Sequence, residues 1–492
     1  MDDIIERRGV CMEKLKNLSK RKKIVLCAAI VLIAIYFIGV YFYSSHFLNG
    51  TTINGVDCSN KTVDAIESKI EKNIKSYELK ITERKELKDS VKGSDIELTY
   101  LDNDVIGKYQ ESQNPFSWPL HIIENKTEKQ LETASYDAKK LTKIFKDFQC
   151  FKKKNITMPV SAYPKYAGDN KYKIQKEVEG NKVLKEKLKT AVINCIMGGD
   201  ESLDIEDAGC YMEPKYRKDD KEIKQLKEEM EKLVKGTLTW DYSNRYINPV
   251  AFKDGLKDNK FIVNGDITNQ FIKIKNHTKA VIDSDAIEDW LIDYATDTNT
   301  IYNGRRFKNH SGKLMNVPSG GPYGWRMNIE KEEKAIKNMM KNGTDKTREP
   351  YYIQKGVEGT NGQINDIGDS YAEVDLTNQT VYIYKDGKQI FSTSCVSGNT
   401  SLGRGTHTGV GVVQYKQKDK VLGGPGYDYE SPVRYWMPFN GGEGFHDADW
   451  RNSFGGTIYK TNGSHGCINL PIYAAATIYN IIDAGWPVVV YY

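Results

Sequence analysis

The stretch Gly463-Ser464-His465-Gly466-Cys467-Ile468-Asn469 is the most informative part of this 492-residue chain. It follows Gly444-Phe445-His446-Asp447-Ala448-Asp449-Trp450, and 17 residues separate His446 from Ser464. A cysteine preceded by histidine and glycine suits nucleophilic chemistry, because a nearby imidazole can take the thiol proton and then stabilise the thiolate. His465 and His446 are both candidates for that imidazole. Glycine at position 466 permits a tight backbone conformation and the close approach of a substrate.

Two other interpretations of these residues are open from the sequence alone. A lone cysteine is most often an inert, buried residue. His446, His465 and Cys467 could also hold zinc, but neither an HExxH nor a CxxC spacing supports a metal centre. We therefore expect neither a metal nor another cofactor at this site.

The sequence around this stretch predicts a compact, mainly β domain over residues 369–492. Polar and apolar side chains alternate in its first segments, as they do in half-buried strands, and Asp386-Gly387 is a strong hairpin turn. The expected elements are strands at residues 372–376, 380–384, 389–396 and 486–492, and one clear helix at 472–482.

These residues resemble the signature of the L,D-transpeptidases of the YkuD type. That signature is a histidine, a spacer, and then Ser/Thr-His-Gly-Cys, an apolar residue and Asn or Arg. Three neighbouring segments also resemble the family, namely Gly405-Thr406-His407-Thr408-Gly409, Tyr435-Trp436-Met437-Pro438-Phe439 and Trp450-Arg451. The resemblance covers about residues 366–492 and implies a β-sandwich. His407 stands where we expect proline, which affects only the shape of that loop.

The resemblance also implies roles for the site residues. Cys467 would be the nucleophile and His446 the general base, with Asp447 helping to orient the ring. A carboxylate there would raise the pKa of His446, whereas an Asp447 side chain that points away would leave only its backbone carbonyl for this task. The other implied residues are His465, Ser464 and Asn469 as pocket and substrate contacts, the backbone N–H groups near Gly466 and Cys467 as the oxyanion hole, and Trp450 and Tyr435 as walls of the acceptor and donor clefts.

The implied reaction consists of two acyl transfers. Cys467 attacks the carbonyl of the third residue of a peptidoglycan tetrapeptide stem, and D-Ala leaves. The side-chain amine of a diamino acid in a neighbouring stem then attacks the thioester, which forms a 3→3 cross-link. Water as the acceptor would give L,D-carboxypeptidase activity instead. The thioester keeps the energy of the cleaved bond, so neither ATP nor a metal is needed, and the resemblance makes carbapenem-type inhibitors expected ligands.

Three other protein classes fit the sequence less well. A papain-like wall endopeptidase places its cysteine before its histidine, whereas His446 precedes Cys467. A sortase pairs its cysteine with a downstream arginine, and no arginine follows Cys467. A non-catalytic wall-binding protein would lack the nucleophile or the base, and neither is missing here.

Residues 24–43, IVLCAAIVLIAIYFIGVYFY, predict one transmembrane helix. Twenty uncharged residues, at a rise of about 1.5 Å each, span roughly 30 Å, the thickness of the hydrocarbon core of a bilayer. Lys20-Arg21-Lys22-Lys23 precedes the run, so the positive-inside rule places residues 1–23 in the cytoplasm and the later chain outside. A cleaved signal peptide is the alternative, but no clear small-x-small cleavage site follows. We expect a single-pass cell-membrane protein with an extracytoplasmic catalytic domain.

Charge and cysteine usage exclude other classes of protein. Residues 1–23 carry eight basic and four acidic side chains, a sum of +4, so only about +1 of the net charge of +5 falls after residue 43. That balance argues against a nucleic-acid-binding body. Six of the eight cysteines follow the predicted membrane helix, and their spacing forms no disulfide framework. Whether Cys195 and Cys210 pair is open from the sequence.

The chain between the anchor and the catalytic domain predicts α+β domains. Asn54-Gly55-Val56-Asp57 and Tyr323-Gly324-Trp325-Arg326 resemble pieces of the peptidoglycan-binding region that precedes the catalytic domain in Gram-positive family members. The resemblance therefore implies that both α+β domains bind peptidoglycan. The expected boundaries are 44–77 for a membrane-proximal segment, 78–235 and 236–345 for the two domains, and 346–368 for a linker.

Overall fold

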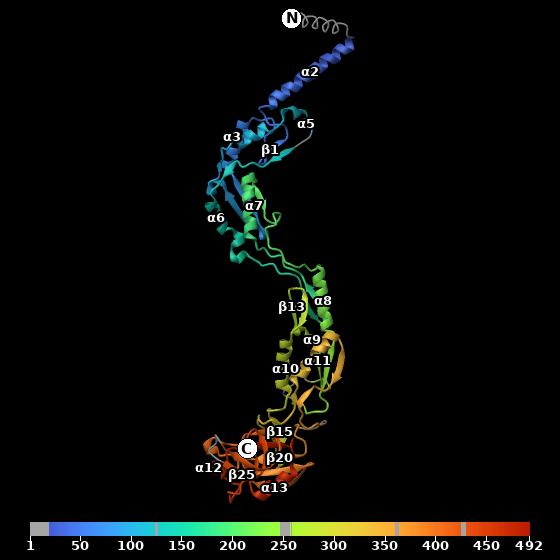
Figure 1. Cartoon of the computed structure of the whole chain (residues 1–492), viewed down its shortest axis with the longest axis vertical. Coiled ribbons are helices and arrows are strands. Elements are labelled where there is room, and N and C mark those ends of the chain that lie inside the picture. The colour runs from blue at the N-terminus through green and yellow to red at the C-terminus, as the bar shows by residue number, and fades with distance from the viewer. Residues whose placement is uncertain (1–18, 124–125, 247–255, 257, 360–363, 425–429) are drawn as a thin grey trace. The chain divides into compact units, whose positions relative to one another are not determined.

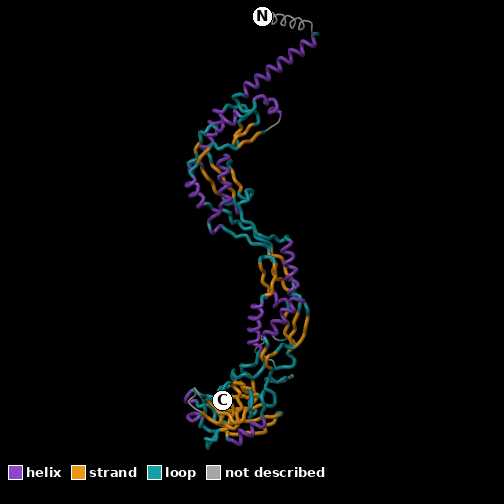
Figure 2. Tube along the Cα trace, viewed as in Figure 1, coloured by secondary structure: helices purple, strands orange, loops and turns teal. Residues whose placement is uncertain are grey.

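The computed structural model describes residues 19–123, 126–246, 256, 258–359, 364–424 and 430–492. The chain divides into two compact units (Figure 1). Unit 1 comprises residues 1–162 and 176–217, and unit 2 comprises residues 163–175 and 218–492. The hairpin of residues 163–175 therefore belongs to unit 2, although unit 1 flanks it in sequence. Strands dominate the C-terminal end of the chain, whereas helices and strands mix in the parts before it (Figure 2).

The apolar N-terminal run forms the helix that its composition predicts. α2 (Lys20–Tyr43) has 24 residues, none of them buried. Ser19 caps the helix, because its side chain accepts a hydrogen bond from the backbone N–H of Lys22. By length and composition, α2 is a candidate membrane span or signal sequence.

Unit 1 has the predicted α+β composition. Its small sheets have the strand orders β2-β1-β6, β10-β3-β4 and β5-β7. Its strands are β1 (Thr51–Ile53), β2 (Val56–Asp57), β3 (Glu78–Thr82), β4 (Lys88–Lys92), β5 (Thr99–Tyr100), β6 (Thr127–Lys129), β7 (Ala134–Ser135) and β10 (Ser202–Asp204). Its α-helices after α2 are α3 (Val63–Lys75), α4 (Val105–Glu111), α5 (Trp118–Ile123), α6 (Ala138–Asp147) and α7 (Lys185–Gly198). The buried faces of α6 and α7 share one apolar core with β3 and β4.

The first part of unit 2 is also α+β and is built around Trp240. The Trp240 side chain is fully buried on β11, and its indole N–H donates to Glu332 on α11 at 2.9 Å. The strands are β8 (Tyr163–Gly168), β9 (Lys171–Gln175), β11 (Thr237–Asp241), β12 (Lys260–Val263), β13 (Ile272–Lys275), β14 (Lys279–Ile282), β15 (Arg305–Lys308), β16 (Leu314–Val317), β17 (Arg326–Met327), β18 (Asp345–Arg348) and β19 (Tyr352–Gln354). The α-helices are α8 (Lys221–Leu233), α9 (Gly265–Thr268), α10 (Ser284–Thr298) and α11 (Ile329–Asn342).

The C-terminal part of unit 2 is a sandwich of two sheets, which confirms the predicted mainly β domain. A five-stranded sheet has the order β22-β21-β20-β28-β23, and a four-stranded sheet has the order β24-β25-β26-β27. Inward side chains of both sheets and of α13 form one apolar core. The elements are β20 (Tyr371–Asp375), β21 (Thr380–Lys385), β22 (Lys388–Ser394), β23 (Gly409–Val412), β24 (Gln417–Gly423), β25 (Glu430–Asn440), β26 (Glu443–Asp447), α12 (Tyr459–Asn462), β27 (Ile468–Leu470), α13 (Ile472–Ile481) and β28 (Pro487–Tyr491).

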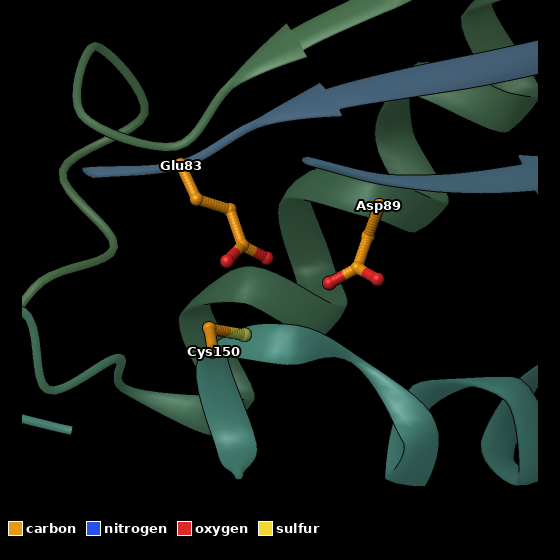
Figure 3. A group of neighbouring side chains, drawn as sticks. All are labelled: Glu83, Asp89 and Cys150. Atoms are coloured by element: carbon orange, nitrogen blue, oxygen red, sulfur yellow. The ribbon is translucent and has the colours of Figure 1, made fainter. Parts of the chain in front are cut away.

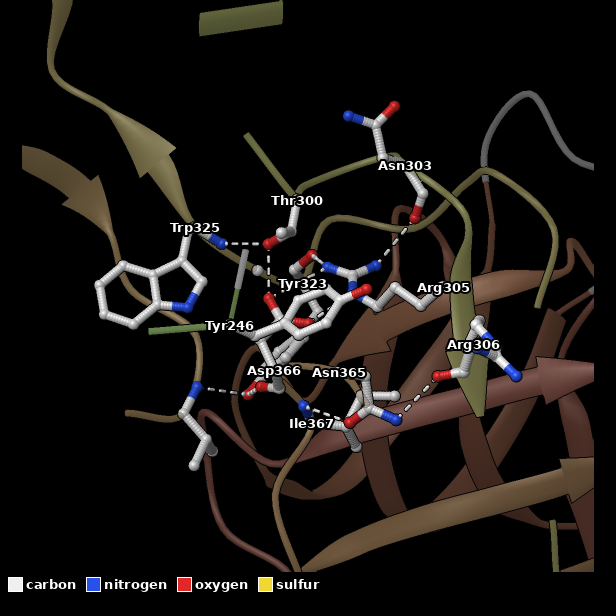
Figure 4. Close-up of polar contacts among 12 residues, drawn as sticks. Tyr246, Thr300, Asn303, Arg305, Arg306, Tyr323, Trp325, Asn365, Asp366 and Ile367 are labelled. Atoms are coloured by element: carbon white, nitrogen blue, oxygen red, sulfur yellow. Dashed lines mark hydrogen bonds and ion pairs between the residues drawn. The ribbon is translucent and has the colours of Figure 1, made fainter. Parts of the chain in front are cut away.

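A buried polar network ties β15 to the chain just before the sandwich (Figure 4). Arg305 Nε donates to Asp366 Oδ1 at 2.6 Å, and both side chains are almost fully buried. The Thr300 hydroxyl donates to the same carboxylate, and the Tyr323 hydroxyl donates to the backbone carbonyl of Asp366 at 2.9 Å. Separating the partners of this buried ion pair would leave an uncompensated charge, so the pair is costly to break. The network therefore holds the segment just before the sandwich against β15.

Candidate active site

The loop of residues 463–467 is held in place by segments from the other end of the domain. The Ser464 N–H donates to a carbonyl of segment 396–399 at 3.0 Å, and the Ser464 carbonyl accepts an N–H from that segment at 2.9 Å. The Thr406 hydroxyl donates to the Gly466 carbonyl at 2.6 Å. These bonds fix the backbone on both sides of His465, directly before Cys467.

The alternation of side chains along the strands places His446, Cys467 and Asn469 on one face of the four-stranded sheet. β26 and β27 run parallel, with His446 beside Asn469. Their neighbours Phe445 and Ile468 are fully buried in the core of the sandwich. Because successive side chains of a strand point to opposite faces, His446 and Asn469 take the face away from the core, and Cys467 follows the same alternation.

The imidazole of His446 is buried and has a defined tautomer. Nδ1 donates to the backbone carbonyl of Asp447 at 2.8 Å, which makes Nε2 the acceptor nitrogen of the neutral ring. Burial lowers the pKa of His446, and the nearby Arg451 lowers it further, while the Asp447 backbone and charge raise it. At rest the ring is therefore a neutral base with Nε2 available to accept a proton.

The thiol of Cys467 is half-buried and protonated at rest. Its Sγ lies 3.6 Å from the Gly442 carbonyl, as a weak donor. Burial raises the pKa of Cys467 to about 12; the Gly444 backbone lowers it, and the charge of Glu443 raises it. A thiol of this pKa becomes a nucleophile at neutral pH only when a base removes its proton in the reaction.

A pocket of about 190 Å³ brings most of the predicted residues together. The Trp450 ring, about half exposed, stands 6.0 Å from the His446 ring, centroid to centroid, and forms one wall. The lining residues are Leu422, Ser431, His446, Trp450, Arg451, Gly463, Ser464, His465, Cys467 and Asn469.

The side chains of two predicted residues, Asp447 and Ser464, bond to the backbone around the site. The Asp447 carboxylate accepts the N–H groups of Arg434 and Tyr435, at 2.9 and 2.8 Å, so only the Asp447 carbonyl orients the ring of His446. The Ser464 hydroxyl donates to the Cys467 carbonyl at 2.6 Å and accepts the Gly466 N–H at 3.0 Å. Both side chains therefore stabilise the backbone around the site.

His465 and Tyr435 are placed differently from His446. His465 is exposed at the rim of the pocket, where its ring Nε2 contacts the guanidinium of Arg404. The Tyr435 ring lies 5.3 Å from the ring of Tyr479 on α13, on the core side of β25, outside the pocket lining. The next residue, Trp436, is the one that faces His446, with ring centroids 6.0 Å apart.

Comparison with known proteins identifies this domain. A family model described as the L,D-transpeptidase catalytic domain, YkuD, matches residues 369–490. The crystal structure of a cysteine-to-serine mutant of the Enterococcus faecium L,D-transpeptidase is 32% identical to this chain over 54% of this chain and 98% of that one, with a TM-score of 0.40. The chain belongs to the L,D-transpeptidases. No curated protein matches it.

Two further solved L,D-transpeptidase structures are similar to this one. An avibactam carbamoyl enzyme is 32% identical over 55% of this chain and 98% of that chain, with a TM-score of 0.41. The catalytic domain of the E. faecium enzyme acylated by ertapenem is 45% identical over 25% of this chain and 97% of that chain, with a TM-score of 0.23.

A buried carboxylate beside the cysteine of this L,D-transpeptidase was not predicted. Glu443 accepts from the backbone N–H of His407 at 3.2 Å and from its ring Nδ1 at 2.9 Å. His407 stands where proline was expected, and proline would have no N–H to donate. Gly466 packs on the same carboxylate, since its φ is +128° and a Cβ there would lie 2.7 Å from Glu443 Oε1. In the sequence, Glu443 follows a Gly-Gly turn and carries no signal of burial.

Arg451 is the second residue that the sequence left without a role. One of its terminal nitrogens, Nη1, donates to the Asn462 carbonyl at 2.8 Å. Its Nε is buried and has no hydrogen-bond acceptor among the described residues. Burial lowers the pKa of Arg451, and no carboxylate of the described chain forms an ion pair with it. The pocket of the L,D-transpeptidase domain thus contains a cation with unused hydrogen-bonding capacity.

Proposed function

We propose that this chain is a membrane-anchored L,D-transpeptidase that forms 3→3 peptidoglycan cross-links through a thioester on Cys467. The observation that carries the proposal is that Cys467 and His446 line one pocket, with His446 Nδ1 bonded so that Nε2 accepts protons. A neutral thiol and a neutral imidazole form a pair suited to general-base catalysis of acyl transfer.

In the first step, His446 Nε2 takes the thiol proton as Sγ attacks the carbonyl carbon of the third stem residue. The C–S bond forms, and the C–N bond to D-Ala breaks as the imidazolium returns its proton to the leaving amine. The oxyanion needs backbone donors. Since the Gly466 N–H already donates to Ser464, we assign this role to the Cys467 N–H.

In the second step, the side-chain amine of a neighbouring stem attacks the thioester carbon and loses a proton to His446. The amide bond of the cross-link forms, and the thiol is restored. Trp450 is exposed beside the His446 ring and is well placed to line the path of the acceptor. Water in place of the amine gives L,D-carboxypeptidase activity, which is the alternative outcome of the same chemistry.

Arg451 supplies the pocket with a site for an anion. Arg451 is only half-buried, but its Nε is buried without an acceptor among the described residues, which favours a ligand that supplies one. Guanidinium groups bind carboxylates with good geometry. Stem peptides carry free carboxylates, at the terminal D-Ala for example. We infer that Arg451 binds a carboxylate of the donor stem when the peptide occupies the pocket.

The proposal also includes the membrane anchor, the expected inhibitors and the role of the domains before the catalytic domain. The length and composition of α2 support a single membrane span. The basic run Lys20-Arg21-Lys22-Lys23 favours residues 1–23 in the cytoplasm and the catalytic domain outside. The ertapenem-acylated relative supports carbapenem-type acylation of Cys467, and the avibactam carbamoyl enzyme supports a reaction with that inhibitor as well. We further propose that residues 78–235 and 236–345 bind peptidoglycan, between a membrane-proximal segment at 44–77 and a linker at 346–368 that leads into the catalytic domain at 369–492.

The test uses the full chain in detergent, a tetrapeptide stem and a carbapenem, with intact mass as the readout. Cys467→Ala should form no adduct with either, whereas the control Cys195→Ala, a cysteine of unit 1, should react as wild type does. His446→Ala should slow acylation about 10²–10⁴-fold, the usual loss of a general base. A wild-type rate in that variant would transfer the role to His465. Mass spectrometry of muropeptides then distinguishes the products: cross-linked dimers support transpeptidation, tripeptides alone support the carboxypeptidase, and unchanged stems indicate a non-catalytic wall-binding protein.

A further inference from the structure

Three acidic groups of unit 1 converge in a buried cluster far from Cys467 in sequence. Glu83 directly follows β3, Asp89 lies on β4, and Cys150 lies in the 3-10 turn η4 (Gln149–Phe151). One ligand atom of each lies within 4.8 Å of those of the other two. Figure 3 shows the three side chains pointing toward a common space between the strands and the turn.

Within the described residues, no basic side chain forms an ion pair with Glu83 or Asp89. The Glu83 side chain is 5% exposed, and neither carboxylate oxygen forms a hydrogen bond of good geometry among the described residues, although Asp89 and Cys150 lie close enough to shift its pKa. Asp89 accepts one bond, from the Gln149 N–H at 2.6 Å. The neighbouring Arg84 is engaged elsewhere, with the carboxylate of Glu206. A buried carboxylate without donors is costly, so either a proton or a cation must lie among these groups.

We propose that Glu83, Asp89 and Cys150 bind a divalent cation of the zinc class. Thiolate sulfur and carboxylate oxygen are zinc ligands, whereas magnesium and calcium prefer oxygen alone. Zn–S and Zn–O bonds of about 2.3 and 2.0–2.2 Å require the three ligand atoms to lie closer together than the 4.8 Å limit, so the side chains would have to close around the ion. Asp89 is only half-buried and leaves a route for entry and for a water as the fourth ligand. The ion would link the β3–β4 hairpin to the turn after α6.

The test is Zn²⁺ binding to the full chain in detergent, in a Cys467→Ala background so that the catalytic thiol contributes nothing. We expect one tightly bound equivalent by elemental analysis after dialysis, and thiolate-to-metal charge-transfer absorption with Co²⁺. Glu83→Gln and Cys150→Ser should each weaken binding at least about 10- to 100-fold, the loss caused even by outer-shell changes. Cys58→Ser, which alters another buried thiol, should bind as the background does. Absence of stoichiometric Zn²⁺ and of the Co²⁺ band in the background protein would overturn the proposal and indicate that a shared proton fills the site.

A second, independent observation concerns the segment of residues 115–123, which comprises the 3-10 turn η3 (Pro115–Ser117) and α5. The Trp118 indole N–H donates to the Tyr36 carbonyl of α2 at 3.0 Å, and the Tyr36 hydroxyl donates to the Phe116 carbonyl at 3.0 Å. Gly39 permits this contact, because a Cβ there would lie 2.3 Å from Trp118 Cε2. The segment is thus packed directly on the candidate membrane helix.

The position of this contact along α2 sets how far the segment lies from the outer end of the helix. Tyr36 precedes the helix end at Tyr43 by seven residues, which is about 10 Å at a rise of 1.5 Å per residue. Phe116, Leu120 and Ile122 are each more than half exposed, an unusual density of apolar surface for a short segment in water. We infer that residues 115–123 insert into the outer leaflet beside α2; this rests on the proposed membrane anchor.

The test places the full chain in phosphatidylcholine–phosphatidylglycerol nanodiscs that contain a photoactivatable phospholipid, and maps the lipid adducts by peptide mass spectrometry. We expect adducts on α2 and on residues 115–123. The triple variant Phe116→Ser, Leu120→Ser, Ile122→Ser should lose the second set alone, whereas Ile353→Ser, a change at another exposed apolar residue, should keep both. Wild-type adducts on α2 without any on 115–123 would refute the insertion, and a lack of adducts on α2 would refute the anchor and the insertion with it.

Discussion

Replacing Arg451 by glutamine tests whether the unpaired cation of the pocket recognises the substrate. The change removes the charge and keeps a polar, though shorter, side chain. A hydrogen bond to a charged group contributes about 1.5–3 kcal/mol. At about 1.4 kcal/mol per tenfold change, Arg451→Gln should lower kcat/KM for a carboxylate-bearing donor stem roughly 10- to 150-fold. Arg451→Lys, which keeps the charge but not the fork, should recover part of the loss.

The assay compares three donors by the rate of D-Ala or D-alaninamide release: a tetrapeptide with a free terminal carboxylate, its terminal amide, and a stem with isoglutamine in place of isoglutamate. Amidation of the carboxylate that Arg451 binds should slow the reaction of the wild-type enzyme. The same amidation should leave the rate of Arg451→Gln unchanged. Lys388→Gln, on the exposed edge strand β22, is the charge control and should behave as the wild type. If Arg451→Gln slows all donors equally, Arg451 does not bind a donor carboxylate and serves only to hold the Asn462 carbonyl.

The same variant has a second readout that a structural role would not produce. The charge of Arg451 lowers the pKa of His446, so its removal should raise that pKa. The base is active when neutral, and the acid limb of the pH profile of kcat/KM should therefore move to higher pH in Arg451→Gln and stay in place in Arg451→Lys. An unmoved acid limb in the glutamine variant would show that the two groups are not electrostatically coupled.

Three further changes probe the surroundings of the thiol. Glu443→Gln removes a negative charge that raises the pKa of Cys467, so alkylation by iodoacetamide, followed by intact mass, should begin at lower pH than in the wild type; an identical profile would contradict this. Asp447→Asn removes a charge that raises the pKa of His446, and the acid limb of acylation should move to lower pH, a shift that pH-resolved carbapenem acylation can measure. Gly466→Ala forces a Cβ against Glu443 at a φ of +128°. Chemical denaturation should therefore show a loss of about 1–3 kcal/mol of unfolding free energy. An unchanged denaturation midpoint would show that the loop relaxes without cost.

Local signals of the sequence predicted a mainly β domain, and the family resemblance implied that it is a sandwich. Residues 371–375 form strand β20 and Asp386-Gly387 forms a hairpin turn, as the periodic and steric signals predict. The half-buried pattern is not confirmed, because Glu373 and Asp375 are buried as well as Ala372 and Val374. Strand alternation separates Ile468 from its neighbours Cys467 and Asn469. On β25, successive side chains point to opposite faces of the sheet, so a shift of one residue changes which ring reaches the pocket. Tyr435 lies on the core side, and Trp436 lies beside His446.

What the sequence could not supply are contacts between distant segments. Glu443 is buried only because the loop that contains His407 supplies two donors to it, from 36 residues away. Arg451 is unpaired only because no carboxylate of the described chain reaches it, which no local pattern reveals. The Asp447 carboxylate binds two N–H groups of β25, so the choice between carboxylate and carbonyl as the partner of His446 depended on strand register.

The electrostatics of the pocket favour a neutral Cys–His pair over a resting thiolate–imidazolium pair. Burial raises the pKa of Cys467 and lowers that of His446, so both shifts oppose charge separation in the empty pocket. The charge of Glu443 raises the pKa of Cys467 further, and the charge of Arg451 lowers the pKa of His446 further. In the proposed mechanism, a thiolate would therefore form only as the carbonyl is attacked, when backbone donors at the oxyanion would take up the developing charge. The resting thiol should then be slow toward simple alkylating agents and fast toward acyl donors that fit the pocket, and a thiol that reacted with both at the same pH-independent rate would contradict this account.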